Sequence, residues 1–252
     1  MPKRLFDLCC AAAGLVLLVP VLAAVALWVV WDSPGPAFFR QQRVGRAGRL
    51  FHIVKFRTMH PRAETAGPPL TVGADGRITR AGHWLRRTKI DELPQLFNVL
   101  LGHMSLVGPR PEVPRYVALY PDDLRTLVLS VRPGITDRAS IEFRDESTLL
   151  GQSSDPERTY VEQILPIKLR YGADYARSHT LRGDLEIILR TLAALWWSAL
   201  AAGLTMGLSL MAMGLFYARL PEGDSAQVIA SLGYSAGFLA VILARQQLFT
   251  EN

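Results

Sequence analysis

Residues 82–107 read GHWLRRTKIDELPQLFNVLLGHMSLV, and this stretch contains the most informative pattern of the chain. The acidic pair Asp91 and Glu92 lies just before Pro94, a residue best tolerated in the first turn of a helix, and Thr88 precedes the pair at the spacing of a weak capping pattern. We therefore predict that the pair lies at or near a helix N-terminus. The following residues form an apolar stripe at helical spacing, which indicates a packed helix: Leu93, Leu96, Phe97 and Leu100.

The surroundings of this acidic pair favour phosphate chemistry. Arg86, Arg87 and Lys89 lie within six residues of it, and a helix N-terminus adds partial positive charge. One carboxylate can attack phosphorus while its neighbour holds a divalent cation, and Mg²⁺ fits because it prefers oxygen ligands together with substrate phosphates. From spacing alone, acids in a first helical turn are more often simple caps, so both interpretations stay open.

Other cations could complete a phosphate site. Lys55 and Arg57 alternate in the strand-like run FHIVKFR, so we expect them on one face, where they suit a diphosphate or are ordinary charges on an edge strand. Arg110 lies between two prolines, which restrict its backbone, and it is a candidate phosphate clamp or part of a plain turn. Arg138 and Arg144 follow a Pro-Gly turn, in a loop over a pocket or on ordinary surface.

Composition restricts the class of protein. The chain has 252 residues, is 50% hydrophobic and carries a net charge of +6, which excludes a disordered or collagen-like protein. Cys9 and Cys10 are the only cysteines, so neither a disulfide framework nor zinc-ligand spacing is present.

The whole charge surplus lies in residues 32–190, where a basic block runs from Arg40 to Arg62 before any acid follows Asp32. Such a block favours an anionic membrane leaflet or a phosphorylated ligand. Nucleic acid is not expected, because aromatic interleaving and a recognition-helix pattern are lacking.

Three long uncharged stretches, 8–31, 191–218 and 225–244, reach or approach the roughly 20 residues that a membrane-crossing helix needs. Basic residues flank the first stretch on both sides, which favours the cytoplasmic side for both of its ends. Pro20, near the middle, should break or kink the helix. We therefore predict a re-entrant membrane helix, with a simple spanning helix that tolerates its proline as the alternative.

Several segments in order, KRLFD, FFRQQRVG, KFRTM, IDELPQLFNVLLGHMSLVGPRPE and RPGIT, resemble the bacterial sugar transferase family, the monotopic polyprenyl-phosphate phosphosugar transferases, over residues 2–193. The resemblance implies transfer of a phosphosugar from a nucleotide diphosphate sugar, with a UDP-sugar expected, to undecaprenyl phosphate. It implies release of UMP and a place at the start of surface glycan biosynthesis, such as exopolysaccharide or lipopolysaccharide.

The resemblance also implies roles for individual residues. Asp91 is implied to be the nucleophile that forms a covalent phosphosugar intermediate, Glu92 to bind Mg²⁺, and Arg86 to contact phosphate. The family's re-entrant helix, broken at a proline, agrees with the interpretation of Pro20. The chain departs from the family's pattern at Lys89-Ile90 and in loop 137–145, where only Arg144 matches, so the sugar and nucleotide preference is not carried over.

Residues from about 194 onward form an apolar hairpin that resembles the start of the formate/nitrite transporter family, especially SALAAGLTMGLSLMAMG and GYSAGFLAVILARQQLFTEN. A conducting pore is not expected from one hairpin. An added anchor, a partner-binding surface and a fusion with a truncated transporter stay open.

The sequence thus predicts a helix-dominated α+β cytoplasmic domain (32–193) on a re-entrant membrane helix (1–31), followed by a transmembrane hairpin (194–252). The expected location is a bacterial inner membrane, with the catalytic domain facing the cytoplasm. The expected partners are a nucleotide sugar, a polyprenyl phosphate and membrane lipids, and a homo-oligomer stays open. A catalytically silent membrane scaffold that acts through its transporter-like tail is the alternative function. The predicted substrate-binding residues are Arg86, Arg110, Lys55, Arg57 and Arg144.

Overall fold

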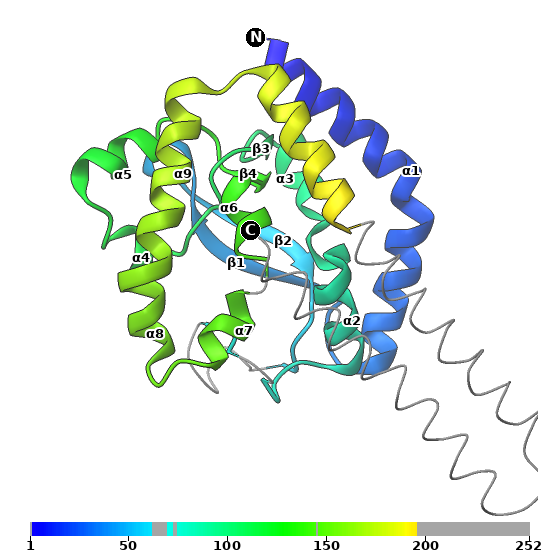
Figure 1. The fold of residues 1–252 in the computed structure, drawn as a ribbon. Helices are drawn as coiled ribbons and strands as arrows, with labels where there is room; N and C mark the ends of the chain where they lie inside the picture. The colour runs from blue at the N-terminus through cyan, green and yellow to red at the C-terminus, as the bar shows by residue number, and fades with distance from the viewer. Residues whose placement is uncertain (1, 62–69, 73–74, 145, 196–252) are drawn as a thin grey trace, which may run out of the picture. The chain divides into compact units, whose positions relative to one another are not determined.

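The computed structural model describes residues 2–61, 70–72, 75–144 and 146–195. Residues 1–191 form one compact unit, and the predicted C-terminal hairpin lies in a second unit, almost all of it outside the described residues. The described part is dominated by helices (Figure 1), which confirms the predicted helix-rich α+β class. The elements are α1 Pro2–Asp32, β1 Phe38–Val44, η1 Arg46–Gly48, β2 Leu50–Phe56, α2 Arg80–Thr88, η2 Ile90–Glu92, α3 Gln95–Leu100, β3 Ser105–Val107, α4 Pro114–Val117, α5 Asp122–Val128, β4 Gly134–Thr136, α6 Arg138–Glu142, α7 Glu146–Gly151, α8 Pro156–Thr159, η3 Tyr160–Ile164 and α9 Leu165–Ser178; residues 181–195 are also helical.

Two small sheets organise the unit. Strands β1 and β2 form an antiparallel hairpin in which Phe38 pairs with Phe56 and Val44 with Leu50. Strands β3 and β4 pair in parallel, with Val107 opposite Thr136. In Figure 1 the β1–β2 hairpin crosses the middle of the unit, with α2 on one side and α9 on the other.

The hydrophobic core has two clusters. The first joins α1 with β2, α2 and α3, and the second packs α4 and η3 against α9. The loop from β3 to α4 runs from the first cluster to the second, because Met104 belongs to one and Tyr116 to the other. This loop contains Arg110, so both clusters support its backbone.

Helix α1 packs along one side only. Its buried residues recur at steps of three, four or seven positions, which places them on one side of the helix, and this side faces α2, α3 and β3: Asp7, Ala11, Leu15, Leu22, Val25 and Val29. Its other side presents large apolar side chains to the exterior, among them Val16, Leu17, Leu27 and Trp31. Within the described residues, α1 is the one helix long and apolar enough to cross a membrane, and only 22% of its most apolar window is buried. The core helix of a soluble protein would be mostly buried, so this face is suited to lipid.

Pro20 does not break α1, which stays helical from Pro2 to Asp32. Figure 1 shows that the unbroken helix bends near its middle as it follows the side of the domain. Proline removes only one hydrogen bond of the helix. The buried side chains Leu22, Val25 and Val29 hold the second half against the domain, so the helix continues.

Both ends of α1 are attached to the same compact unit. Near the beginning, Lys3 Nζ donates to the Val107 carbonyl oxygen at 3.2 Å, and Asp7 accepts a hydrogen bond from Ser105 Oγ at 2.8 Å. After the last turn, Arg57 donates to the Ser33 carbonyl oxygen at 2.7 Å. A straight crossing would place the two ends of α1 on opposite sides of a bilayer, whereas here one domain binds both ends.

Candidate active site

Asp91 and Glu92 lie in a short 3₁₀ turn, η2, between α2 and α3. The chain reverses at Lys89, whose φ of 59° is in the left-handed region that non-glycine residues seldom adopt. Thr88 does not cap this turn, because its hydroxyl donates back to the Trp84 carbonyl oxygen at 3.0 Å. The acidic pair nevertheless lies just before α3, as the position of Pro94 predicted.

Among the described residues, Asp91 has an oxygen without a hydrogen-bond partner, whereas both oxygens of Glu92 accept hydrogen bonds. The Asp91 side chain is 6% exposed, and its Oδ1 atom has no hydrogen-bond partner within the described structure. A buried acceptor left without a partner costs free energy, so such an atom in a native site calls for a role. Burial and then the negative charge of Glu92 raise the pKa of Asp91 well above its ordinary value.

Glu92 is paired. Arg110 Nη2 donates to Oε1 at 2.5 Å and Arg110 Nη1 donates to Oε2 at 3.2 Å, which is the bidentate geometry of strong arginine–carboxylate pairs. Burial opposes ionisation of Glu92, but the Arg110 guanidinium outweighs it and lowers the pKa of Glu92. Two adjacent acids thus have opposite environments, and Glu92 is held ionised beside an unpartnered Asp91.

A close backbone approach positions Arg110. A Cβ on Gly134, the first residue of β4, would lie 2.1 Å from the Gly108 nitrogen, so β4 and the loop after β3 can approach this closely only because glycine is present. The Arg110 backbone N–H then donates to Asp137 Oδ2 at 3.2 Å. The predicted clamp is therefore preordered by a second loop as well as by its two prolines.

Lys55 and Arg43 belong to the same side of the β1–β2 hairpin, since Lys55 pairs with Phe39 and Arg43 with Phe51. Burial, and then the positive charge of Arg43, lower the pKa of Lys55 to about 8, while Asp91 and Glu92 act in the opposite direction. The structure thus brings Lys55 near the acidic pair. The sequence analysis placed Arg43 in the basic block but did not name it as a site residue. Pairing residues 38–44 with residues 50–56 as a hairpin would have placed Arg43 on the same side as Lys55.

Arg86 reaches the site because α2 packs closely on the end of β2. A Cβ on Gly82 would lie 2.0 Å from the Thr58 carbonyl oxygen, so only glycine permits this approach. Arg86 Nε then donates to Thr58 Oγ1 at 2.9 Å and Nη1 to Thr71 Oγ1 at 3.0 Å. The Asp91 charge acts on this guanidinium and opposes the lowering of its pKa by burial.

The structure does not bring Arg57 together with Lys55. Arg57 is 5% exposed and donates to the carbonyl oxygens of Ser33 and Pro36, both at 2.7 Å, beyond the C-terminal end of α1. Arg57 directly follows Phe56, the last residue of β2, and its side-chain contacts are with the segment after α1 rather than with the acidic pair, so its contact with substrate stays a prediction. Arg144, two residues after α6, is half-buried, and its contact with substrate stays a prediction.

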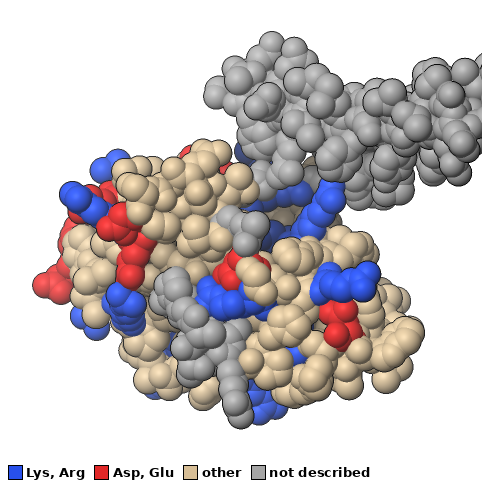
Figure 2. Space-filling view, turned by 90° about the horizontal axis from the view of Figure 1, so that it is seen from below, with Lys and Arg blue, Asp and Glu red and all other residues tan. Residues whose placement is uncertain are grey.

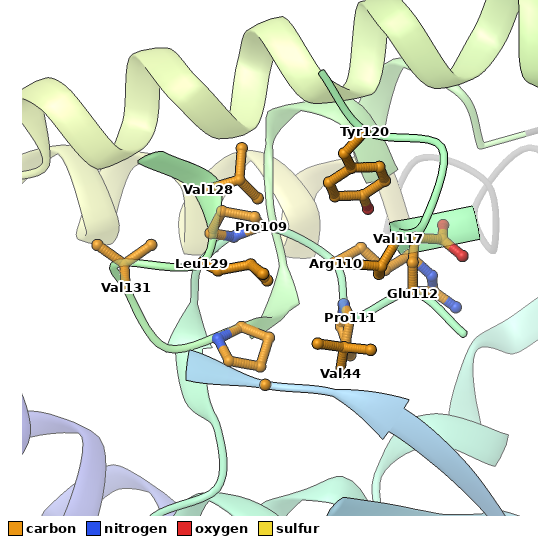
Figure 3. A pocket seen from close by; sticks show the side chains of 12 residues that line it. Val44, Pro109, Arg110, Pro111, Glu112, Val117, Tyr120, Val128, Leu129 and Val131 are labelled. Atoms are coloured by element: carbon orange, nitrogen blue, oxygen red, sulfur yellow. The ribbon is translucent and has the colours of Figure 1, made fainter. Parts of the chain in front are cut away.

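A small cavity lies behind the Arg110 loop (Figure 3). Val44, Pro109, Pro111, Tyr120, Val128 and Leu129 are among the residues that line it. Its volume is about 10 Å³, enough for roughly one water molecule, so it is a packing defect and too small for a sugar nucleotide. Seen from below, by contrast, Lys and Arg side chains gather at the middle of the domain beside a smaller acidic group (Figure 2), a surface suited to an anionic substrate.

Comparison with known protein families decides the class. The model of the bacterial sugar transferase family matches residues 1–198. The chain belongs to this family. The formate/nitrite transporter family matches residues 181–252, so both resemblances predicted from the sequence are confirmed.

Sugar transferases from several bacteria are similar to the chain. A UDP-glucose:undecaprenyl-phosphate glucose-1-phosphate transferase of Caulobacter vibrioides is 38% identical over 204 residues, covering 77% of this chain and 69% of the relative. A protein of that same name from Xanthomonas campestris is 41% identical over 75% of this chain and 37% of its own length. A UDP-N-acetylgalactosamine-undecaprenyl-phosphate N-acetylgalactosaminephosphotransferase of Aeromonas hydrophila is 35% identical over 75% of this chain and 42% of its own.

In this sugar transferase, five cations therefore act on the carboxylates of Asp91 and Glu92: Arg43, Lys55, Arg86, Lys89 and Arg110. The excess of positive charge leaves the site able to accept further anionic groups. A catalytically silent scaffold is not favoured, because the relatives are named as transferases and the charged site is intact.

Proposed function

We propose that this sugar transferase moves a phosphosugar from a nucleotide diphosphate sugar, with a UDP-sugar as the expected donor, to undecaprenyl phosphate. The names of the relatives support both substrates. The observation that carries the proposal is the unpartnered Oδ1 of Asp91, a buried carboxylate oxygen within a ring of cations. An anionic diphosphate is attracted by these cations, and its electrophilic phosphorus gives the unpartnered oxygen a reaction partner.

In the first step Asp91 attacks the phosphorus that is attached to the sugar. A bond forms between the carboxylate oxygen and this phosphorus, and the bond from phosphorus to the bridging oxygen of the diphosphate breaks. The electron pair leaves with UMP, and the phosphosugar remains on Asp91 as an acyl phosphate. Arg86 and Arg110 are placed to balance the charge that develops on the phosphoryl oxygens.

In the second step an oxygen of undecaprenyl phosphate attacks the same phosphorus. The acyl bond to Asp91 breaks, the carboxylate is restored, and the product is undecaprenyl diphosphate sugar. The two substrates thus bind one after the other, so the site need not hold both. The exposed apolar face of α1 would rest in the bilayer, with both ends of the helix on the cytoplasmic side, and would keep the site near the lipid headgroups.

Mg²⁺ is the cofactor that we propose for this site. No group of three or more His, Cys, Asp or Glu side chains suited to a metal occurs among the described residues. We therefore propose that substrate phosphate supplies some of the ligands of the ion. The remaining lone pairs of Glu92 fit an ion that usually takes one or two carboxylates and completes its shell with phosphate. When bound there, Mg²⁺ would neutralise phosphoryl charge, with Glu92 as its main ligand.

The decisive experiment separates the two possible nucleotide products. The full chain in detergent is incubated with Mg²⁺, undecaprenyl phosphate and each of a panel of UDP-sugars, and UMP and UDP are quantified separately. UMP formed together with a lipid-linked product is expected. UDP would mean simple glycosyl transfer and would overturn the mechanism, and no turnover from any nucleotide diphosphate sugar would overturn the proposed activity.

The covalent step has its own test. A donor with radiolabelled sugar phosphate, supplied without lipid acceptor, should label the wild-type protein in a bond that hydroxylamine cleaves, as expected of an acyl phosphate. The exposed residue Asp174, on α9, provides the control, because Asp174→Asn should label like wild type. Labelling that persists in Asp91→Asn would contradict the assignment of the nucleophile.

A further inference from the structure

Arg43 is a largely buried cation of the site, and its side chain donates hydrogen bonds to other groups of the protein. Its side chain is 16% exposed, and every nitrogen of its guanidinium has an acceptor. Nε and Nη2 donate to Gln41 Oε1 at 3.2 and 2.6 Å, and Nη1 donates to the Pro111 carbonyl oxygen at 3.0 Å. A guanidinium engaged in this way is arranged to hold protein groups rather than to receive a substrate phosphate.

The group that Arg43 holds is the loop of the phosphate clamp. Pro111 directly follows Arg110, so the hydrogen bond from Arg43 fixes the peptide on the C-terminal side of the clamp. On its other side, the Arg110 N–H is already bound by Asp137 at 3.2 Å. The backbone of Arg110 is therefore held from both directions, and the direction in which its side chain leaves the loop follows from these two contacts.

Glu112 strengthens the same attachment. Its carboxylate accepts from Tyr160 Oη at 2.5 Å and from Arg43 Nη1 at 3.5 Å, and its carbonyl oxygen accepts from the Val44 N–H at 3.0 Å. Tyr160 is 2% exposed and belongs to the second core cluster. The charged pair thus ties β1 and the clamp loop to a rigid part of the core.

We propose that Arg43 is a positioning residue of the phosphosugar transfer, which orients Arg110 through the Pro111 carbonyl with Glu112 and Tyr160 as its support. The inference rests on the proposed function, because Arg110 must contact a phosphate for its orientation to affect the rate. Arg43 itself touches neither substrate nor the reacting atoms. Its contribution is the geometry of the clamp, and a displacement of about 1 Å in a catalytic site can slow a reaction about 100-fold.

The matched variants are Arg43→Gln and Arg40→Gln. Both residues lie on β1, but Arg40 is exposed and belongs to the opposite side of the hairpin. In the UMP-release assay, with the donor that wild type uses best, we expect kcat/KM to fall about 10-fold in Arg43→Gln and to stay within about twofold in Arg40→Gln. Equal kcat/KM values for the two variants, in an active enzyme, would overturn the positioning role and leave the proposed function intact. A wild type that releases no UMP would overturn both.

A double-mutant cycle tests whether the effect passes through Arg110. If it does, adding Arg43→Gln to an Arg110→Lys enzyme should lower kcat/KM by about twofold or less, because the clamp is already displaced. If the two losses multiply, Arg43 acts independently and the inference is wrong. Tyr160→Phe extends the test to a variant that keeps the charged pair. We expect kcat/KM per folded molecule to fall about threefold and the melting temperature to drop, because the Glu112 carboxylate loses a donor. Wild-type kinetics would remove Tyr160 from the network.

Discussion

Two arginines that the sequence associates with phosphate contact different parts of the molecule: Arg110 contacts the turn at Asp91, and Arg57 contacts the junction after α1. The two arginines meet different acceptors. Arg110 forms a bidentate pair with the carboxylate of Glu92, next to an Asp91 oxygen without a partner. Arg57 instead donates to the carbonyl oxygens of Val29, in the last turn of α1, and of Ser33 and Pro36, which follow the helix. Positive charge alone therefore does not define the site, because the two arginines differ in the nature of their acceptors.

The largest effect that this comparison predicts is at Asp91. Asp91→Asn keeps the shape of the side chain but removes the nucleophile, so UMP release should fall by at least about 1,000-fold. The melting temperature should not fall, because Asp91 Oδ1 has no hydrogen bond to lose within the described structure, and burial disfavours the charge that the amide removes. Turnover of 10% or more of wild type would contradict the prediction, and membrane flotation of the variant checks that it remains anchored.

Arg110→Lys tests the bidentate pair. A lysine keeps the positive charge but has a single ammonium group instead of a planar guanidinium. Glu92 and a bound phosphate would therefore lose their bidentate hydrogen bonds but keep the opposite charge nearby. We expect kcat/KM for the nucleotide sugar to fall about 30-fold. Arg115→Lys, in an exposed ion pair on α4, is the control and should behave like wild type. Full activity in Arg110→Lys would show that charge alone is sufficient.

How far the sequence predicts this molecule depends on the range of the interaction. Asp91, Glu92 and Arg110 lie within about twenty residues and are governed by local turns and prolines, and the structure brings them together as expected. Arg43 and Glu112 come together through hairpin pairing and a loop between two core clusters, which no local pattern contains. The contacts of Arg57 with the end of α1 and the residues that follow it are likewise tertiary and could not be predicted from the local pattern.

Helix α1 shows the same division. Its length and apolar character follow from composition, and the bend agrees with a proline near its middle. Its unbroken path depends on side chains such as Val25 and Val29, which pack on α2 and α3. The sequence of the helix alone could not show which of its faces the domain covers, because apolar residues surround it on all sides.

Gly82→Ala tests how closely α2 must approach β2. The new Cβ would lie 2.0 Å from the Thr58 carbonyl oxygen, so α2 has to shift and Arg86 loses its hydrogen bond to Thr58. We expect kcat/KM to fall about fivefold, with a loss of stability of about 1–3 kcal/mol from overpacking. Gly76→Ala, where a Cβ would have open space, is the matched control. Equal kinetics in the two variants would mean that Arg86 does not need this approach.

The smallest effect on catalysis is expected at Arg57, where the comparison predicts a change of stability instead. Arg57→Met keeps the apolar stem but leaves the carbonyl oxygens of Ser33 and Pro36 without their donor, so the free energy of unfolding should fall by about 2 kcal/mol. For a domain of this size the melting temperature should drop by about 4–8 °C, while kcat/KM per folded molecule stays within about twofold. Arg49→Met, in the exposed turn between β1 and β2, should change neither quantity. If Arg57→Met instead raised KM for the nucleotide sugar at an unchanged melting temperature, Arg57 would be a substrate contact. The difference between carboxylate and carbonyl acceptors would then no longer distinguish the turn at Asp91 from the junction after α1.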